Sequence, residues 1–470
     1  MAARSGEGGR LRTRAARPHD PGVRVRPAAE HSTVNEYPYW WDTVPALRAG
    51  SQKSEVRNQK SEVGRAELPS RADVVIVGAG YTGLAAARQL ARAGATVLVV
   101  ERERIGWGAS SRNGGQVLTG LRLEPATLVA RFGERRARQL FEAAAESIVR
   151  IEALIAEERI DCEYARTGHI QAAWKPAHFE AFRTEQALLA RVFDHRVHLV
   201  PRAEQRAEIG TDAYHGVLVD ERSGGLNPAQ YVHGLAAAAA RSGARIITGV
   251  GVDRMRQRSG GWLVETTGGV VETRDVLVAT NGYTNGAAPA LQRRFVPIGS
   301  YIIATVTLDA SLAAALLPRR RMAFDSKHFL YYFRVTPDGR LLFGGRAQFG
   351  RPTPGTIRRA TAVLRDGMTL IFPELAAERI DYAWGGNVAF TRDQVPRAGK
   401  LDGLYYAGGY CGHGIAMATY LGEQIARRIA GEPIDHPLFD DRFPAIAMYS
   451  GNPWFLPLVG AYYRVRDWLQ

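Results

Sequence analysis

The sequence predicts an α/β fold in which a parallel sheet is assembled from separated segments of the chain and a large, mostly antiparallel sheet is interleaved with it. Runs of buried β-branched residues alternate with segments of helical period early in the chain. Residues 295–350 instead alternate apolar and polar positions in several short runs, as antiparallel strands do. The length of 470 residues allows two or three domains.

Two N-terminal segments are expected to lie outside these sheets. Residues 1–35 are rich in Arg, Pro, Ala and Gly and have no apolar period, so we expect a disordered Arg-rich extension. Residues 36–70 are interpreted as an aromatic strap and a polar linker. The strap begins with YPYWWD at 37–42, and in the linker QKSEV occurs twice, seven residues apart.

A strand–helix–strand unit follows the linker. Residues 73–77 are a continuous β-branched run typical of a buried parallel strand, residues 84–93 have helical spacing, and residues 96–100 form a second buried run. In chain order we then expect a long amphipathic helix at 141–158, a strand at 167–174, helical period at 176–210, a helix at 228–240, and strands at 245–248 and 275–279.

The antiparallel sheet and a final helix occupy the second half of the chain. Strands are expected at 300–307, 329–336 and 340–344, the last two joined by Pro337-Asp338-Gly339. A helix at 416–430 ends at Gly431, with Pro433 beyond it.

A glycine motif lies between the first strand and the first helix. Gly78 permits a tight turn, Gly80 lets a pyrophosphate approach the backbone, and Gly83 lets helix and strand pack closely. The helix N-terminus then offers unpaired N–H groups to the phosphates. Glu101 closes the second strand, where a carboxylate can accept hydrogen bonds from ribose hydroxyls. This context predicts binding of an adenine dinucleotide.

Two more glycine-rich stretches suggest which dinucleotide it is. The long loop IGWGASSRNGGQ at 105–116 can follow the diphosphate outward to a bound ring system, which a nicotinamide domain does not require. Residues 403–415 run from a strand through a glycine turn into a helix, whose N-terminus would stabilise an anion on the N1–C2=O edge of a reduced flavin. His413 either adds a donor there or is satisfied locally at the helix cap.

These motifs together resemble a known family. The glycine motif with Glu101, GWGASSRNGG, ATNGYT at 279–284 and YCGHGIA at 410–416 resemble the FAD-dependent amine and D-amino-acid oxidase (DAO) superfamily. The resemblance is strongest to γ-glutamylputrescine oxidoreductase-like proteins, which share the YWWD-type segment, the strand PIGSYIIAT and the apolar C-terminal tail. It covers about residues 36–470 and implies an enzyme that binds FAD and oxidises a C–N bond.

The implied architecture is a Rossmann-like FAD-binding domain with an interleaved substrate domain. We assign 71–160, 211–290 and 385–435 to the first, 161–210 and 291–384 to the second, and 436–470 to the apolar tail. The candidate cofactor-binding residues are Gly78, Gly80, Tyr81, Thr82, Gly83, Glu101, Arg102, Gly108, Ala109, Ser110, Ser111, Asn113, Gly114, Gly115, Gln116, Val252, Gly282, Gly412, His413, Gly414 and Ile415. Ser110 and Ser111 stand where some members carry a flavin-linked histidine, and Trp384-Gly385-Gly386 where others carry a linked cysteine, so non-covalent FAD is expected.

Substrate contacts are expected from the face of the antiparallel sheet that looks toward the flavin. The candidate catalytic residues are His413, Tyr332 and Arg334, and the candidate substrate-binding residues are Tyr301, Arg346 and Trp384. Aromatic side chains can enclose an amine, and an arginine can bind a carboxylate through two hydrogen bonds. Because side chains alternate along a strand, only one of Tyr331 and Tyr332 can face inward.

The implied reaction is hydride transfer from the carbon that bears nitrogen to the flavin, followed by hydrolysis of the imine. We expect an amine or amino-acid substrate and molecular oxygen as acceptor, without a metal. Two alternatives stay open: a D-amino-acid dehydrogenase that passes electrons to a quinone, and a non-catalytic flavin-binding subunit.

Composition narrows the partners and the compartment. The net charge is +14, but only five of the 61 basic residues are lysines and no basic stripe is interleaved with aromatics, so nucleic-acid binding is not expected. Cys162 and Cys411 cannot form a disulfide framework. Without a signal sequence or an apolar run of 18 residues, a cytoplasmic protein is expected. The tail at 452–466 is apolar and then basic, and docking on the protein's own surface is favoured over membrane contact.

Overall fold

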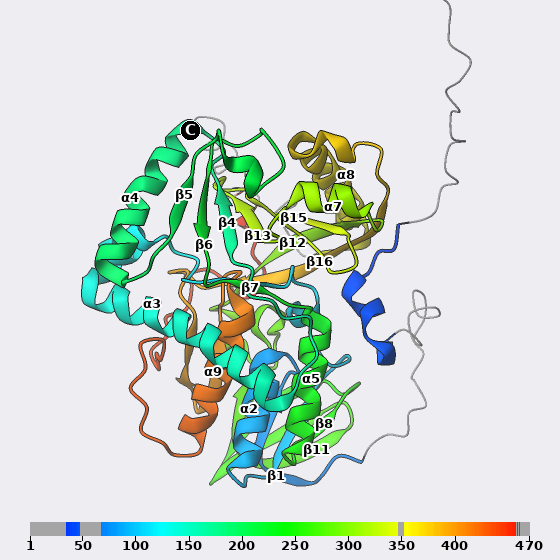
Figure 1. Cartoon of the computed structure of the whole chain (residues 1–470). Coiled ribbons are helices and arrows are strands. Elements are labelled where there is room, and N and C mark those ends of the chain that lie inside the picture. The colour runs from blue at the N-terminus through cyan, green and yellow to red at the C-terminus, as the bar shows by residue number, and fades with distance from the viewer. Residues whose placement is uncertain (1–33, 48–66, 346–351, 457, 459, 461–470) are drawn as a thin grey trace, which may run out of the picture. The chain divides into compact units, whose positions relative to one another are not determined.

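Two eight-stranded sheets organise the computed structural model, which describes residues 34–47, 67–345, 352–456, 458 and 460 (Figure 1). The predicted disordered extension lies outside the described residues except for its last two positions, and so do most of the polar linker and the end of the tail. The predicted α/β fold, with one largely parallel and one mostly antiparallel sheet, is confirmed.

The first sheet holds the predicted parallel strands in the order β17-β18-β11-β1-β2-β8, with the hairpin β9–β10 attached to β11. Its strands are β1 (Arg71–Val77), β2 (Val97–Val100), β8 (Arg245–Ile247), β9 (Val252–Arg258), β10 (Gly261–Thr266), β11 (Gly269–Val278), β17 (Arg397–Leu401) and β18 (Leu404–Gly408). Strands β18, β11, β1, β2 and β8 run parallel to one another. The hairpin β9–β10 was not predicted, because β9 is mostly exposed and charged and therefore lacks an apolar pattern.

Both faces of the centre of this sheet are covered, which explains the continuous apolar runs of β1 and β2. Val74 and Ile76 pack in one cluster with helices α2 (Tyr81–Arg92), α5 (Pro228–Arg241) and α9 (Gly414–Ile429), which lie on the same side of the sheet (Figure 1). Val75 points to the opposite face and packs with Val264 of the hairpin.

The second sheet has the order β16-β12-β15-β14-β13-β4-β6-β5, and every neighbouring pair is antiparallel except β13 and β4. Its strands are β4 (His169–Ala172), β5 (His198–Val200), β6 (Val217–Asp220), β12 (Val296–Thr305), β13 (Met322–Asp325), β14 (Tyr331–Val335), β15 (Leu341–Gly345) and β16 (Ile380–Phe390). Strand β6 lies in a segment predicted for the cofactor domain, yet it pairs within this sheet. The proposed domain boundaries otherwise stay a prediction.

Several helices differ from the expectation. The helix expected at 141–158 is the second part of α3 (Pro125–Glu158), which contains a non-helical Gly133 with φ of 72°. Of the segment 176–210, for which helical period was expected, only Pro176–Phe193 forms an α-helix, α4. The rest of the segment contains β5 and a short 3-10 helix. Helices α7 (Ala310–Leu316) and α8 (Pro354–Ile371) were not predicted. The remaining short elements are η1 (Tyr39–Thr43), η2 (Ala109–Ser111), η3 (Gln205–Ala207), η4 (Asn281–Tyr283), η5 (Pro373–Leu375), α6 (Pro289–Gln292), β3 (Gln116–Val117) and β7 (Gly224–Gly225).

The aromatic strap (here residues 34–47) packs against the second sheet. Trp40 is fully buried in a cluster with Ile302 and Trp384. Asn35 forms a parallel bridge with Tyr382 of β16. The strap therefore adds a short extra segment to the edge of that sheet.

The described part of the C-terminal tail packs against the rest of the protein. The Tyr449 hydroxyl donates to the carbonyl of Phe295 at 2.9 Å, and Leu456 is buried nearby.

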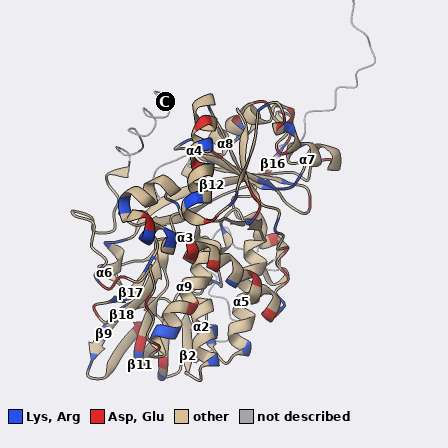
Figure 2. Cartoon of the chain, turned by 60° about the vertical axis from the view of Figure 1, so that its left-hand side comes forward, with Lys and Arg blue, Asp and Glu red and all other residues tan. Residues whose placement is uncertain are grey.

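Basic and acidic residues are interspersed over the helices that pack on both sheets in Figure 2. None of the helices in the described ranges is long and apolar enough to cross a bilayer.

Candidate active site

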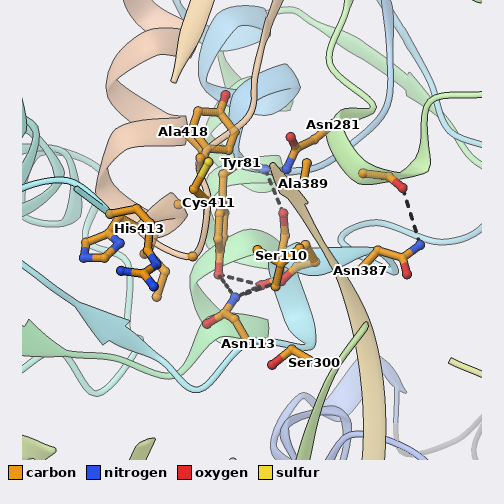
Figure 3. A pocket seen from close by; sticks show the side chains of 18 of the residues that line it. Tyr81, Ser110, Asn113, Asn281, Ser300, Asn387, Ala389, Cys411, His413 and Ala418 are labelled. Carbon is orange, nitrogen blue, oxygen red and sulfur yellow. Dashed lines mark hydrogen bonds between the residues drawn. The ribbon is translucent and has the colours of Figure 1, made fainter. Parts of the chain in front are cut away.

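A cavity of about 670 Å³ is lined by residues of both sheets. One end is lined by the turn between β1 and α2 and by the loop after β2, and the other by residues of β4, β12 and β14. Several of the side chains that line it are shown in Figure 3. The cavity therefore connects the predicted nucleotide motif with the face of the antiparallel sheet.

The glycine motif places the N-terminus of α2 at the cavity. Gly78 has φ of 108°, which favours glycine, and it lines the cavity together with Gly80. A Cβ atom on Gly83 would lie 2.0 Å from the Gly78 carbonyl oxygen, so helix and turn pack as closely as the motif predicts. Gly80 caps α2 without a side-chain hydrogen bond, and the N–H of Tyr81 donates to the Ser110 hydroxyl, so the next N–H groups of the first turn are the ones available to an anion.

Glu101 braces this turn from the end of β2. Its carboxylate accepts hydrogen bonds from the backbone N–H of Ala79 and of Glu103, each at 2.9 Å. Glu101 and Arg102 also line the cavity. The carboxylate is thus held at the rim of the site, where its remaining lone pairs can accept further hydrogen bonds.

The loop 105–116 is fixed by its own polar side chains. The Tyr81 hydroxyl donates to the Ser110 carbonyl at 2.5 Å, and the Ser110 hydroxyl accepts from the backbone N–H of Tyr81 at 3.1 Å (Figure 3). The Asn113 amide donates to the carbonyls of Ala109 and Ser110 and accepts from the N–H of Gly115. The backbone that faces the cavity is therefore well ordered before any ligand arrives.

Three tryptophans hold the same loop from its outer side. The indole N–H of Trp40 donates to the Asn113 carbonyl at 2.8 Å, and that of Trp41 donates to the Ser111 hydroxyl at 2.8 Å. The indole N–H of Trp384 donates to the Arg112 carbonyl at 2.9 Å. The Arg104 guanidinium lies 3.7 Å from the Trp41 ring centroid. Trp384 and Ser111 thus support the loop and do not line the cavity, which corrects the expected direct contacts of both residues.

A second helix N-terminus, that of α9, reaches the cavity near its middle. His413 caps α9 and has no partner for Nδ1, and burial, Arg122 and His169 lower the pKa of His413 to about 3. The imidazole is therefore neutral at physiological pH and carries a single N–H donor. Gly412 has φ of 102°, which favours glycine in this turn.

Cys411 lies in the same turn and is buried. Its thiol donates to the Gly409 carbonyl at 3.1 Å, and burial raises the pKa of Cys411 to about 11. The thiol is therefore protonated and weakly nucleophilic.

The antiparallel sheet contributes Ser300 and Tyr332, whose hydroxyls lie 3.0 Å apart and which both line the cavity. Tyr331 points to the other face and packs on Phe343, as alternation requires. Tyr301 also faces away, because its neighbour Ser300 faces inward; its hydroxyl donates to Thr356 at 3.2 Å. The expected substrate contact of Tyr301 is therefore corrected.

Arg334 is buried behind the cavity wall. Its Nη1 donates to the carbonyls of Gly115 at 3.0 Å and Leu226 at 2.8 Å, and the residue does not line the cavity. Arg334 follows Tyr332 by two residues and lies on the same face of β14, but the loop 105–116 covers its side chain. The expected direct role of Arg334 is therefore replaced by a supporting one, and Arg346 lies outside the described residues.

Most of the predicted cofactor-binding residues meet at the cavity. Those that line it are Gly78, Gly80, Tyr81, Thr82, Glu101, Arg102, Gly108, Ala109, Ser110, Asn113, Gly114, Gln116, Val252, Gly282, Gly412, His413, Gly414 and Ile415. Gly83, Ser111 and Gly115 do not line it and act through packing or hydrogen bonds in the wall.

Two basic residues of the cavity were not predicted from the sequence. Arg122 lines it, its buried Nε has no hydrogen-bond partner, and no ion pair to it is found within the described ranges. Lys327 pairs with Asp325 at 3.1 Å and lies 4.0 and 3.9 Å from the rings of Trp174 and Tyr331. Both occur in loops outside any motif, so the sequence carried no signal for them.

Comparison with known proteins identifies relatives of the whole fold. The family model described as FAD dependent oxidoreductase (DAO) matches residues 73–428. A γ-glutamylputrescine oxidoreductase of Escherichia coli (strain K12) is 32% identical over 406 residues, which cover 84% of this chain and 92% of that protein. A probable oxidoreductase OrdL of Rhizobium meliloti (strain 1021) is 33% identical over 403 residues, with coverage of 84% and 92%.

Solved structures show a similar fold. The crystal structure of glycine oxidase from Geobacillus kaustophilus gives a TM-score of 0.67 at 22% identity, over 78% of this chain and 97% of that chain. At this level of identity the likeness concerns the fold alone.

Proposed function

This chain belongs to the family of FAD dependent oxidoreductases (DAO) and is an FAD-dependent enzyme, and on that premise we propose that it oxidises a C–N bond in an amine or amino acid of the γ-glutamylputrescine type. The observation that carries the proposal is the continuity of the cavity from the glycine motif to Ser300 and Tyr332. A cofactor held at one end would present its reactive ring to a substrate held at the other.

The residues of the cavity fit FAD. The α2 N-terminus suits a diphosphate, Glu101 suits a ribose, and the α9 N-terminus suits the carbonyl edge of a flavin ring. A Cβ atom on Gly114 would lie 3.2 Å from the Tyr332 ring, so a larger residue there would narrow the passage between loop and sheet. FAD, when bound, supplies a two-electron acceptor that takes a hydride from the substrate carbon bearing nitrogen.

The chain's own residues position the substrate and control its charge. Tyr332 and Ser300 form a polar wall that can orient an amine by hydrogen bonds. Arg122 has no ion-pair partner among the residues that the structure describes, and its buried Nε has no hydrogen-bond partner, which suits a substrate carboxylate. His413, being neutral, can donate one hydrogen bond without adding a charge. The imine product would hydrolyse to a carbonyl compound and ammonia or an amine.

The test is anaerobic mixing of the holoenzyme with a panel of amines and amino acids. We expect the flavin absorbance to bleach with γ-glutamylputrescine or a close analogue, and hydrogen peroxide to form when air is readmitted. A flavin that no amine or amino acid bleaches would refute the proposal and indicate a non-catalytic flavin-binding subunit.

A second candidate is a D-amino-acid dehydrogenase that passes electrons to a quinone. It is favoured by the exposure of Met448 and Trp454 in the tail, which are 84% and 57% exposed and could touch a membrane surface. Bleaching by D-amino acids without peroxide in air would support this candidate over an oxidase.

We further propose that FAD is bound non-covalently in a cytoplasmic protein. The Cys411 thiol is protonated and engaged with Gly409, and Cys162 is also an unpaired, buried cysteine. After acid denaturation, the yellow colour should remain in the supernatant; colour that precipitates with the protein would contradict non-covalent binding.

A further inference from the structure

Part of the cavity wall lies outside the cofactor motifs, and we call this part the side chamber. The side chamber is formed by Phe141 of α3, Glu185 and Leu189 of α4, His195, and Leu218 of β6, all of which line the cavity. Helix α4 lies beside the β5–β6 edge of the second sheet in Figure 1, and α3 packs against α4. Its walls are largely apolar.

Two carboxyl groups, those of Glu185 and Glu124, lie at the side chamber. Glu185 lines the cavity, and no hydrogen bond or ion pair to it is found in the part of the chain that the structure describes. Burial and the neighbouring charge of Glu124 raise the pKa of Glu185 to about 7. Glu124 lines the same cavity and is exposed. A partly buried carboxylate without a partner gains from a cation beside it.

His195 lies at the same side chamber and is paired with Asp220. The side chain is 1% exposed, and its Nε2 lies 2.6 Å from a carboxylate oxygen of Asp220, which also accepts from the Thr119 hydroxyl at 2.5 Å. Burial is the strongest influence on Asp220 and opposes its ionisation, but the hydrogen bonds from His195 and Thr119 and the electrostatic effect of His169 and His195 together outweigh it, so the pKa of Asp220 is lowered. His195 and Asp220 are thus engaged with each other, and the carboxylate of Glu185 is the group that faces the cavity.

Glu185 lies in the middle of α4, and His195 follows the end of that helix. Glu185 and Leu189 are four residues apart and therefore share one face of α4, and the His195 N–H donates to the Leu189 carbonyl at 3.1 Å. The Phe141 ring lies 5.2 Å from the His195 ring. Arg122 comes from the loop that carries Glu124, but its charge acts on Cys411 and His413 at the cofactor end.

We infer that the side chamber binds a second cationic group of the substrate, an alkylammonium separated by methylene groups from the C–N bond that is oxidised. The inference rests on the proposed function and narrows it to amines that carry a second cation. The two carboxylates can accept hydrogen bonds from an ammonium group, and the apolar side chains of Phe141, Leu189 and Leu218 match its methylene chain. An uncharged alkyl tail would leave the carboxylates unpaired.

The test compares matched monoamines and diamines on the holoenzyme by titration calorimetry. The probes are butylamine with 1,4-diaminobutane and heptylamine with 1,7-diaminoheptane. We expect at least one diamine to bind about tenfold more tightly than its monoamine, the factor that one charged hydrogen bond supplies. Equal dissociation constants within both pairs would overturn the inference.

Two variants connect the preference to the side chamber. Glu185→Gln keeps the shape of the side chain and should abolish the diamine preference, whereas Glu124→Gln, at an exposed position, should reduce it about twofold. Glu180→Gln is the matched control, because Glu180 lies on the same helix, is 68% exposed and does not line the cavity. A preference unchanged in Glu185→Gln, or lost equally in Glu180→Gln, would refute the assignment.

Flavin bleaching separates this inference from the proposed function. Bleaching by amines without any diamine preference would refute the subsite and leave the function intact. A diamine preference in binding without bleaching by any amine would leave the subsite intact and refute the function.

Discussion

The two ends of the cavity are built from different parts of the polypeptide. The cofactor end consists mainly of backbone: the glycine turn at Gly78, the helix starts of α2 and α9, and the loop 105–116. The substrate end consists of side chains from distant strands and helices, such as Ser300, Tyr332 and Glu185. A site built from backbone needs glycine where two parts of the chain approach closely, whereas a site built from side chains tolerates the substitution of one residue by another. The cofactor end should therefore respond to changes of one methyl group and the substrate end to changes of charge.

The largest expected effect comes from adding one methyl group at the cofactor end. In Gly83→Ala the new Cβ would lie 2.0 Å from the Gly78 carbonyl oxygen, so the turn must move. We expect a loss of about 3 kcal/mol in stability and loss of bound FAD. The ratio of flavin to protein after gel filtration and the thermal midpoint measure both effects.

Gly355→Ala is the matched control for this change. Gly355 also lies in a helix, but its Cβ would meet nothing within 4 Å. The variant should bind FAD normally and be as stable as the wild type or slightly more so. Normal FAD content in Gly83→Ala would show that the close packing of turn and helix is not required.

Arg334→Met tests whether this arginine belongs to the substrate end or to the wall behind it. The structure predicts a loss of about 2–3 kcal/mol in stability, because the carbonyls of Gly115 and Leu226 lose their donor in a buried place. Urea unfolding measures the loss. A variant of normal stability with a raised KM would instead restore the direct substrate contact expected from the sequence.

The pH dependence of stability tests His413, which lies where the two ends meet. The pKa of about 3 in the folded state is below the value of about 6.5 in the unfolded chain. Protonation therefore favours unfolding, and stability that is complete above pH 6.5 falls as the pH is lowered toward 3. Between pH 7.5 and pH 5 this histidine should account for about 2 kcal/mol.

His413→Gln should remove that part of the pH dependence. His436, whose pKa is lowered to about 4 by burial and by Arg136, has the same sign and remains in the variant as an internal reference. Urea unfolding of both proteins at pH 5 and pH 7.5 gives the difference. An equal loss in the wild type and in His413→Gln would mean that His413 is not held neutral in the fold.

The smallest expected effect comes from outside the cavity. Trp41→Phe keeps an aromatic ring but removes the donor to Ser111, which costs about 1 kcal/mol and should weaken FAD binding about fivefold. Flavin fluorescence during titration of the apoprotein measures the dissociation constant. Trp454→Phe, at a 57% exposed position in the tail, should leave it unchanged. Equal FAD affinity of Trp41→Phe and the wild type would limit the strap to a purely structural role.

The difference between the two ends also explains what the sequence could predict. Gly78, Gly80 and Gly83 act within one turn, so their spacing in the sequence is enough to predict the nucleotide-binding turn. Tyr301 and Ser300 are neighbours on β12, and which of them faces the cavity depends on strand register, which the sequence alone did not determine. Arg334 was placed on the correct face of its strand, but the loop that covers it comes from more than 200 residues earlier.

Arg122, Glu185 and His195 were not predicted because no local sequence motif includes them. They come together only when the loop before α3 meets α4 and β6. The hairpin β9–β10 was missed for a different reason, since its charged, exposed strand does not show the alternation of a half-buried one. Tertiary contacts, rather than propensities, decide these cases.

The strap also has a consequence for the order in which the protein is made. Asn35 exchanges backbone hydrogen bonds with Asp381 and Ala383 at 2.9 Å, so this segment leaves the ribosome early but finds its place only after residue 383 has been synthesised. Until then Trp40 lacks its packing partner Trp384. The strap therefore reaches its final place on the second sheet late in synthesis, although it is among the first parts of the chain to be made.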